Sequence, residues 1–101
     1  MNERDAFAAL GDANRREIVR SLVDGAKSVQ EIADDMPISR PAVSRHLKVL
    51  KSAGLVDVRA EGVRNVYSLT TAGVSDVRDF LEEIWGTATA RFRLFVDNTP
   101  E

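Results

Sequence analysis

The sequence predicts a mainly α-helical fold with one small β-hairpin, in the element order α-α-α-α-β-β-α. Three observations predict it. Apolar residues recur at helical spacing in five segments, capping residues and glycines mark the ends of those segments, and two short β-branched segments flank one turn. The chain has 101 residues, which suits one domain, residues 1–101, around one hydrophobic core.

The first three helices are short and begin or end at recognisable residues. The first covers about residues 3–10. Asp12 has the position of an N-cap for the second helix, which Gly25 ends. Ser28 and Glu31 have the spacing of a capping box, which predicts that a third helix starts directly after Ser28. We expect the apolar sides of the first two helices to face the core.

A fourth helix, residues 39–53, has two unlike faces. Val43, Leu47 and Leu50 fall in one narrow stripe at about 100° per residue, so this side must face the core. The opposite side carries two cations and two hydroxyls, and the helix contains no carboxylate. Such a face is equipped for phosphates and base edges, and the alternative is an ordinary solvated basic face.

The remaining segments predict a hairpin and one long helix. Residues 55–60 and 65–69 are β-branched or aromatic and partly alternating, and a charged tip that contains Gly62 separates them. Apolar residues then recur at three- and four-residue spacing over about residues 71–96, which predicts the final helix.

Helices, a short turn, a further helix and a hairpin follow one another in the order of a winged helix-turn-helix, whose helix after the turn enters the DNA major groove. Residues 39–66 contain six Lys or Arg against two carboxylates, a net charge of +4, whereas the whole chain carries −2 and the remainder therefore −6. We expect the helix at 39–53 to read double-stranded DNA. The wing at 59–64 should touch the flanking backbone or the minor groove.

Ten residues are candidates for DNA contact. Arg45 is the first candidate for a base, because guanidinium pairs bidentately with guanine, whereas Lys48 and Lys51 suit phosphates. His46 lies beside the apolar stripe, so we expect it to pack or hydrogen-bond inside the domain, with a phosphate contact as the alternative. The alternative role of the two wing arginines is to keep the exposed hairpin tip soluble without contacting DNA. The full set is Ser39, Arg40, Pro41, Ser44, Arg45, His46, Lys48, Lys51, Arg59 and Arg64.

The chain resembles the arsenic-repressor (ArsR/SmtB) family of bacterial winged-helix transcriptional repressors in the segments "ALGDANRREIVRSL", "ISRPAVSRHLKVLKSAGLV" and "RAEGVRNVYSLT". The resemblance covers nearly the whole chain. It implies a homodimer held by the first and last helices, about residues 3–10 and 71–96. It also implies binding to an imperfect palindrome in the protein's own promoter or a neighbouring one.

The last helix predicts a dimer independently of the resemblance. Its apolar seam is longer than a small domain can easily cover alone, and it includes Trp85 and phenylalanines, which are enriched at interfaces. The alternative is that this helix only folds back over its own core. The candidate interface residues are Phe7, Leu10, Val77, Phe80, Leu81, Ile84, Trp85, Ala88, Phe92 and Phe95.

The composition excludes several kinds of site. The chain has no cysteine and one histidine, which excludes disulfides, thiolate metal sites and redox sensing through cysteine. Metal-sensing members of the family carry a Cys-x-Cys motif where this chain has "SVQEIADDM". Asp76, Asp79 and Glu83 can share one helical face, but solvated surface charges explain them more simply. We therefore expect no metal site and no cofactor, and the sequence identifies no small-molecule effector.

Three further expectations concern location and function. No apolar run can span a membrane and the N-terminus lacks the character of a signal peptide, which predicts a cytoplasmic protein without a membrane partner. A winged-helix protein-interaction module is the alternative function, but it predicts an uncharged or apolar recognition face. We expect no enzyme, because no acid–base candidates converge with a nucleophile or metal.

Overall fold

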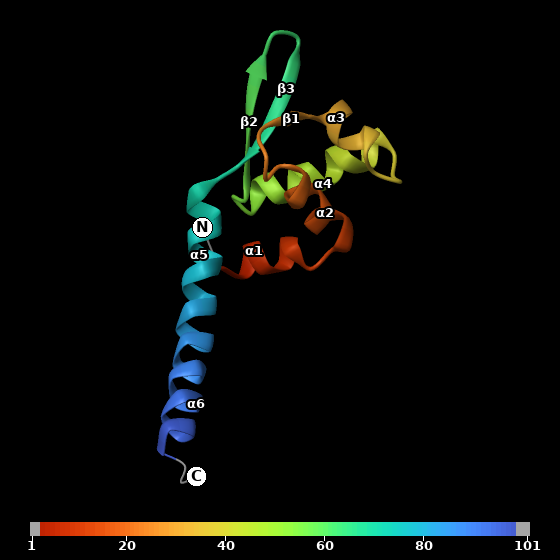
Figure 1. Cartoon of the computed structure of the whole chain (residues 1–101). Coiled ribbons are helices and arrows are strands. Elements are labelled where there is room, and N and C mark those ends of the chain that lie inside the picture. The colour runs from red at the N-terminus through yellow and green to blue at the C-terminus, as the bar shows by residue number, and fades with distance from the viewer. Residues whose placement is uncertain (1–2, 99–101) are drawn as a thin grey trace.

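Four short helices and a small sheet form a body from which a long helical arm extends (Figure 1). The computed structural model describes residues 3–98, and the side-chain surroundings of residues 5–93. The helices of the body are α1 (Glu3–Leu10), α2 (Ala13–Ser21), α3 (Val29–Asp34) and α4 (Arg40–Ser52). The strands are β1 (Lys27–Ser28), β2 (Val56–Glu61) and β3 (Arg64–Leu69), and the arm consists of α5 (Thr71–Leu81), the π-helical turn η1 (Glu82–Gly86) and α6 (Thr87–Asn98).

The predicted N-caps of α2 and α3 form. The Asp12 carboxylate accepts a hydrogen bond from the backbone N–H of Arg15 at 3.1 Å. Ser28 and Glu31 form both halves of a capping box, since each side chain accepts a hydrogen bond from the backbone N–H of the other residue. Because the first N–H groups of a helix have no intrahelical partner, these contacts fix where α2 and α3 begin.

The core closes around the predicted stripe of α4. Val43, Leu47 and Leu50 have no exposed surface, and they form one cluster with Ile18 of α2 and Ile32 of α3. α2 and α3 therefore hold α4 by its apolar side. Its other side, which carries the cations and hydroxyls, remains exposed.

One strand was not predicted. β1 pairs antiparallel with β3, so the hairpin belongs to a three-stranded sheet in the order β1-β3-β2. β1 contains only two residues, too few for any alternating pattern, and it becomes a strand through its pairing with β3. The body therefore has the order α-α-β-α-α-β-β before the arm, and the predicted winged helix-turn-helix fold is confirmed.

The arm begins where the final helix was predicted to begin, but it is not one regular helix. Five residues, Glu82–Gly86, are wound as a π-helical turn between α5 and α6. α5 packs against α1, whereas α6 extends away from the body and the chain spans 65 Å in its longest direction (Figure 1). Within the described residues, no helix combines the length and the apolar character needed to cross a membrane.

Gly73 lets α5 start directly against the end of α4. The Thr70 hydroxyl donates to the Gly54 carbonyl at 2.5 Å, and the same hydroxyl oxygen accepts from the Gly73 N–H at 3.3 Å. A Cβ atom at Gly73 would lie 2.4 Å from the Gly54 carbonyl oxygen, a backbone atom that cannot swing aside. We therefore expect Gly73→Ala to lower the free energy of unfolding by on the order of 1–3 kcal/mol, measured by urea denaturation.

Gly86→Ala is the matched control for this prediction. A Cβ atom at Gly86 meets nothing within 4 Å, and alanine is the better helix former by up to about 1 kcal/mol. This variant should unfold at the same or a higher urea concentration than wild type. Equal losses in the two variants would contradict a steric explanation at Gly73.

Candidate nucleic-acid interface

A basic groove of about 430 Å³ lies between the exposed face of α4 and the hairpin β2–β3. Ser44, Arg45, Lys48 and Lys51 reach it from successive turns of α4, and all four side chains are exposed. The hairpin forms the opposite wall. The hairpin residues that line the groove are Val58, Ala60, Asn65 and Tyr67.

The groove carries charge of one sign. Its α4 wall provides three cations, and none of the residues that line it is acidic. The Ser44 hydroxyl, the Asn65 amide and the Tyr67 hydroxyl add hydrogen-bonding groups between these charges. This combination of fixed cations and neutral donors suits a polyanion whose bases also carry hydrogen-bonding edges.

Ser39, Arg40 and Pro41 lie at the exposed start of α4. The Ser39 hydroxyl accepts a hydrogen bond from the Ala42 N–H at 3.2 Å and so caps the helix. Arg40 Nη1 donates to the Gln30 amide oxygen of α3 at 3.1 Å. Pro41 occupies the first turn, where a missing N–H costs no intrahelical hydrogen bond. These residues set the start of α4 and connect it to α3.

His46 lies on the inner border of α4 and is half-buried. Its Nδ1 atom is 3.4 Å from Arg15 Nη1, and Arg15 Nε donates to the Ala9 carbonyl at 2.6 Å. Because guanidinium can only donate, His46 Nδ1 is the acceptor in the first contact. Together the two contacts of Arg15 tie α4 to α2 and α1. The structure therefore places His46 where an internal role was expected, and a phosphate contact stays a prediction.

Arg59 and Arg64 lie on the face of the hairpin that points away from the groove. Paired residues of an antiparallel ladder share a face, and Arg59 pairs with the buried Val66. Arg59 Nη2 is 3.0 Å from Glu61 Oε2, and Arg64 Nη1 is 3.4 Å from Glu31 Oε1. The structure therefore does not bring the wing arginines together with the cations of α4.

Asn65 and Tyr67 are groove residues that were not predicted. They face α4 because the two-residue turn Gly62–Val63 pairs Asn65 with Ala60 and Tyr67 with Val58. Gly62 has a φ angle of +64°, and glycine is the residue that a type II′ turn requires at its first central position. A Gly-X pair between two β-branched segments is the signal that predicts this register.

The Glu31 carboxylate joins the cap of α3 to the wing. Hydrogen bonds from the Ser28 backbone N–H and then from the Ser28 hydroxyl lower the pKa of Glu31, and the charges of Arg64 and Lys27 lower it further. The unfolded chain therefore takes up this proton first. The stability that the carboxylate contributes is complete above an unfolded pKa of about 4.3 and is lost as pH falls through the lower folded pKa.

Glu31→Gln should remove the contribution of this carboxylate to the pH dependence of the free energy of unfolding, because glutamine keeps a capping oxygen without the charge. We expect wild type to be more stable than the variant near neutral pH and the difference to shrink as pH falls below about 4. Urea denaturation over a pH series measures it. Asp24→Asn, in the exposed turn after α2, is the control for the loss of one negative charge outside a helix cap.

The candidate dimer residues divide between the body and the arm. Phe7 of α1 and Phe80 of α5 pack edge to face within the chain, with ring centroids 5.1 Å apart. Leu10 and Val77 are half-buried against the core. The first part of the seam therefore packs on its own domain, as the alternative interpretation of a helix folded back over its own core predicts. The exposed candidates are Leu81, Ile84, Trp85, Ala88 and Phe92, and the side chain of Phe95 lies outside the described residues.

The carboxylates of the last helix do not form a metal centre in the described chain. Asp79 Oδ1 is 3.9 Å from Arg78 Nε. Among the residues that the structure describes, no three His, Asp or Glu side chains converge on a position for a metal ion.

The part of the sequence that contains the helix-turn-helix matches a known family. Residues 12–58, from the cap of α2 into β2, match the family model described as "Bacterial regulatory protein, arsR family". The HTH-type transcriptional regulator Rv2034 of Mycobacterium tuberculosis is 45% identical over 93 residues, which cover 92% of this chain and 87% of that protein. The transcriptional repressor SdpR of Bacillus subtilis is 35% identical over 72 residues, covering 71% and 80% of the two chains.

Solved structures agree with these sequences. A crystal structure described as a "Possible transcriptional regulator for arsenical resistance" superposes with a TM-score of 0.76 at 33% identity, over 95% of this chain and 98% of that one. The homodimeric winged helix-turn-helix DNA-binding domain of a protein from Mycobacterium bovis, described as "a possible ArsR-family transcriptional regulator", gives a TM-score of 0.66 at 28% identity, over 88% of this chain and 80% of that one. With a relative so similar over nearly its whole length, this chain belongs to the ArsR family of bacterial regulatory proteins.

Proposed function

We propose that the protein is a DNA-binding transcriptional repressor that acts in the cytoplasm and binds a palindromic operator as a homodimer. In each subunit α4 enters the major groove, and Arg45 and Ser44 face the bases. Lys48 and Lys51 meet phosphates further along the helix. Repression follows when the bound dimer covers a promoter.

The observation that carries this proposal is the groove between α4 and the hairpin. Three cations, a serine, an asparagine and a tyrosine line it without any carboxylate, in a chain whose net charge is −2. Positive charge gathered on one face of an acidic protein is the electrostatic footprint of a nucleic-acid partner. A protein-interaction module would not require this segregation.

The wing supplies the second contact with DNA. Asn65 and Tyr67 lie on the side of the hairpin that faces α4, so we add them to the candidate contacts. Arg59 and Arg64 lie on the other side in exposed ion pairs, which contribute little and exchange readily. We propose that both arginines exchange their carboxylates for flanking phosphates when the wing meets the backbone.

The exposed arm supports the homodimer. Trp85 is 60% exposed and Phe92 is 69% exposed in the single chain, and large apolar side chains exposed along one helix mark an interaction surface. A second copy that packs along this arm buries both residues. Two-fold symmetry then sets two α4 helices roughly 34–36 Å apart, one turn of DNA, and doubles the phosphate contacts.

Selection of binding sites from random double-stranded DNA tests the proposal. We expect the purified protein to enrich an imperfect palindrome whose half-site centres are about 10 base pairs apart, with nanomolar affinity. Binding should weaken steeply with salt, because released counterions dominate affinity. Enrichment of no sequence, with salt-independent or undetectable binding, would leave the protein-interaction module as the better explanation.

A further inference from the structure

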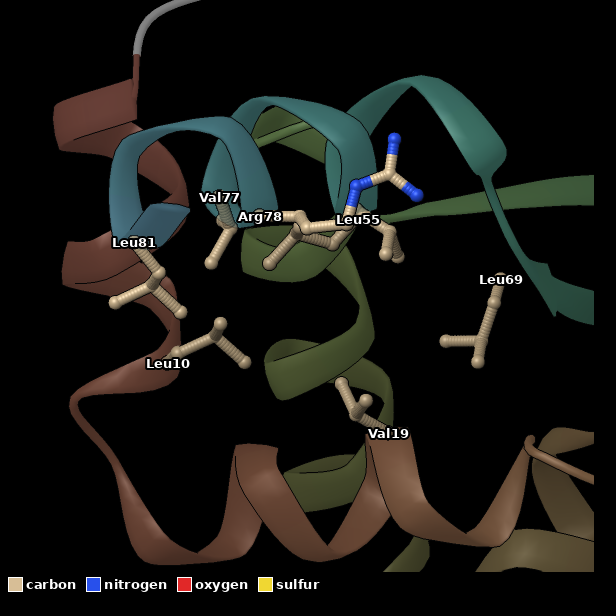
Figure 2. Close-up of a pocket in the computed structure, with 8 residues that line it drawn as sticks. Leu10, Val19, Leu55, Leu69, Val77, Arg78 and Leu81 are labelled. Carbon is tan, nitrogen blue, oxygen red and sulfur yellow. The ribbon is translucent and has the colours of Figure 1, made fainter. Parts of the chain in front are cut away.

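A second cavity, of about 280 Å³, lies between α5 and the rest of the body, away from the basic groove (Figure 2). Four of the residues that line it come from different parts of the fold: Leu10 of α1, Val19 of α2, Leu55 before β2 and Leu69 at the end of β3. α5 lines the remaining side with the half-buried Val77 and the partly exposed Val74 and Leu81, so the cavity is open to solvent there. Figure 2 shows these side chains directed toward one common space.

Arg78 is the one charged residue among those that line this apolar cavity. Figure 2 shows its guanidinium at the edge, directed away from the leucines and valines. The side chain is 63% exposed, and its Nε atom is 3.9 Å from the carboxylate of the equally exposed Asp79. Such a loose surface pair is worth little, so an anion at the mouth of the cavity can replace it.

The size and the apolar lining of the cavity favour a bound ligand. Protein cores are close-packed, and side chains around an empty space lose the dispersion contacts that a filling group would provide. An apolar cavity of about 150 Å³ accommodates benzene. The 280 Å³ present here therefore suits an alkyl ligand of roughly eight to ten carbon atoms.

We propose that this cavity binds a medium-chain carboxylate, and that its occupancy regulates DNA binding. The alkyl chain lies among Val19, Leu55 and Leu69. The carboxylate stays at the solvent-exposed edge, where Arg78 pairs with it through charge-assisted hydrogen bonds. An apolar interior with one cation at its rim matches this class of amphipathic anion at both ends.

The place of the cavity in the fold provides the route to α4. The Leu55 N–H donates to the Leu50 carbonyl in the last turns of α4 at 2.9 Å, and the Leu55 carbonyl accepts from the Thr70 N–H before α5 at 3.0 Å. A ligand held between Leu55 and α5 therefore sets the position of the arm relative to α4. The regulatory part rests on the proposed function, because the arm fixes the spacing of two α4 helices only in the homodimer.

Calorimetric titration of the wild-type protein with octanoate tests the site. We expect one site per chain. Val19→Phe fills the cavity and should weaken octanoate binding about tenfold or more. Val23→Phe is the matched control, because Val23 is 68% exposed and does not line the cavity, and it should bind as wild type does. Absence of saturable binding to wild type, as expected if a partner's side chain fills the cavity, would overturn the site.

Two further measurements do not depend on how Val19→Phe folds. Arg78→Gln should weaken octanoate binding about fivefold while leaving the binding of 1-octanol unchanged, since only the carboxylate needs the guanidinium. In wild type, nuclear Overhauser effects should connect the octanoate chain with the methyl groups of Val19 and Leu69. Binding without these effects places the ligand elsewhere and overturns the proposal.

Operator titrations with and without saturating octanoate test the regulatory part. We expect octanoate to change operator affinity at least about fivefold in wild type and not in Val19→Phe. Confirmed binding with unchanged operator affinity would overturn the regulatory part alone. Failure of the ligand-free protein to bind any operator would instead count against the proposed function, while the calorimetric result on the site would still stand.

Discussion

Trp85→Glu is expected to convert the proposed homodimer into monomers. The Trp85 side chain is 60% exposed on the arm, and a partner that covers it would bury the new carboxylate in the interface, where Arg78 and Arg93 line the same hollow. Removing a carboxylate from water costs several kcal/mol, and a surface cation offsets only part of this, so a small interface should separate. Light scattering should then report the mass of one chain, 11.1 kDa, in place of twice that mass. A single subunit keeps only half of the phosphate contacts, so its affinity should fall toward the non-specific range of about 10⁻⁴–10⁻⁶ M.

Thr87→Glu is the control for this change. Thr87 follows Trp85 by two positions, which places its side chain on the opposite side of the helix, and it is exposed. The same charge introduced there should leave the dimer and its operator affinity intact. A Trp85→Glu protein that remains dimeric would refute the arm as the interface.

Arg45→Ala is expected to weaken operator binding by about 1–3 kcal/mol, or roughly 5- to 150-fold, and to relax the preference for the base pair that it contacts. Arg45 lies exposed in the groove between α4 and the hairpin, and its removal leaves the buried stripe of that helix untouched. The dimer should therefore persist. Fluorescence anisotropy with the selected operator, and with each single-base variant of it, measures both effects.

Arg20→Ala distinguishes a specific contact from loss of general charge. Arg20 lies exposed on α2, where it pairs with Glu17, and its replacement changes the net charge by the same amount. We expect this variant to bind the operator nearly as wild type does. Equal losses of affinity for Arg20→Ala and Arg45→Ala would mean that position 45 reads no base.

Much of the body could be predicted because its signals are local. The stripe of Val43, Leu47 and Leu50 needs only the period of a helix, and the caps at Asp12 and Ser28 need only residues three positions away. β1 could not be predicted in this way. Its two residues form a strand because β3 passes beside them, and that contact depends on the assembled fold.

The same distinction applies to the candidate site. Ser44, Arg45, Lys48 and Lys51 share a groove because they share a face of one helix, which spacing alone predicts. Which wing residues face the groove depends on the register of two strands. A shift of that register by one residue moves every side chain to the other face of the sheet. Without that register, the sequence predicts that Arg59 and Arg64 lie on the wing, but it does not predict that Asn65 and Tyr67 are the wing residues facing α4.

The π-helical turn in the arm changes what its apolar residues can do. A π turn holds about one residue more than an α-helical turn, so the helix beyond it is rotated by roughly 100° relative to an uninterrupted one. A single helical period applied across Glu82–Gly86 therefore gives the wrong relative directions for side chains on α5 and α6. Val77 on α5 packs against the subunit's own core, whereas Phe92 on α6 lies beyond the π turn and is 69% exposed. The arm can thus be anchored to its own subunit through α5 while the exposed apolar side chains beyond it stay available to a second subunit.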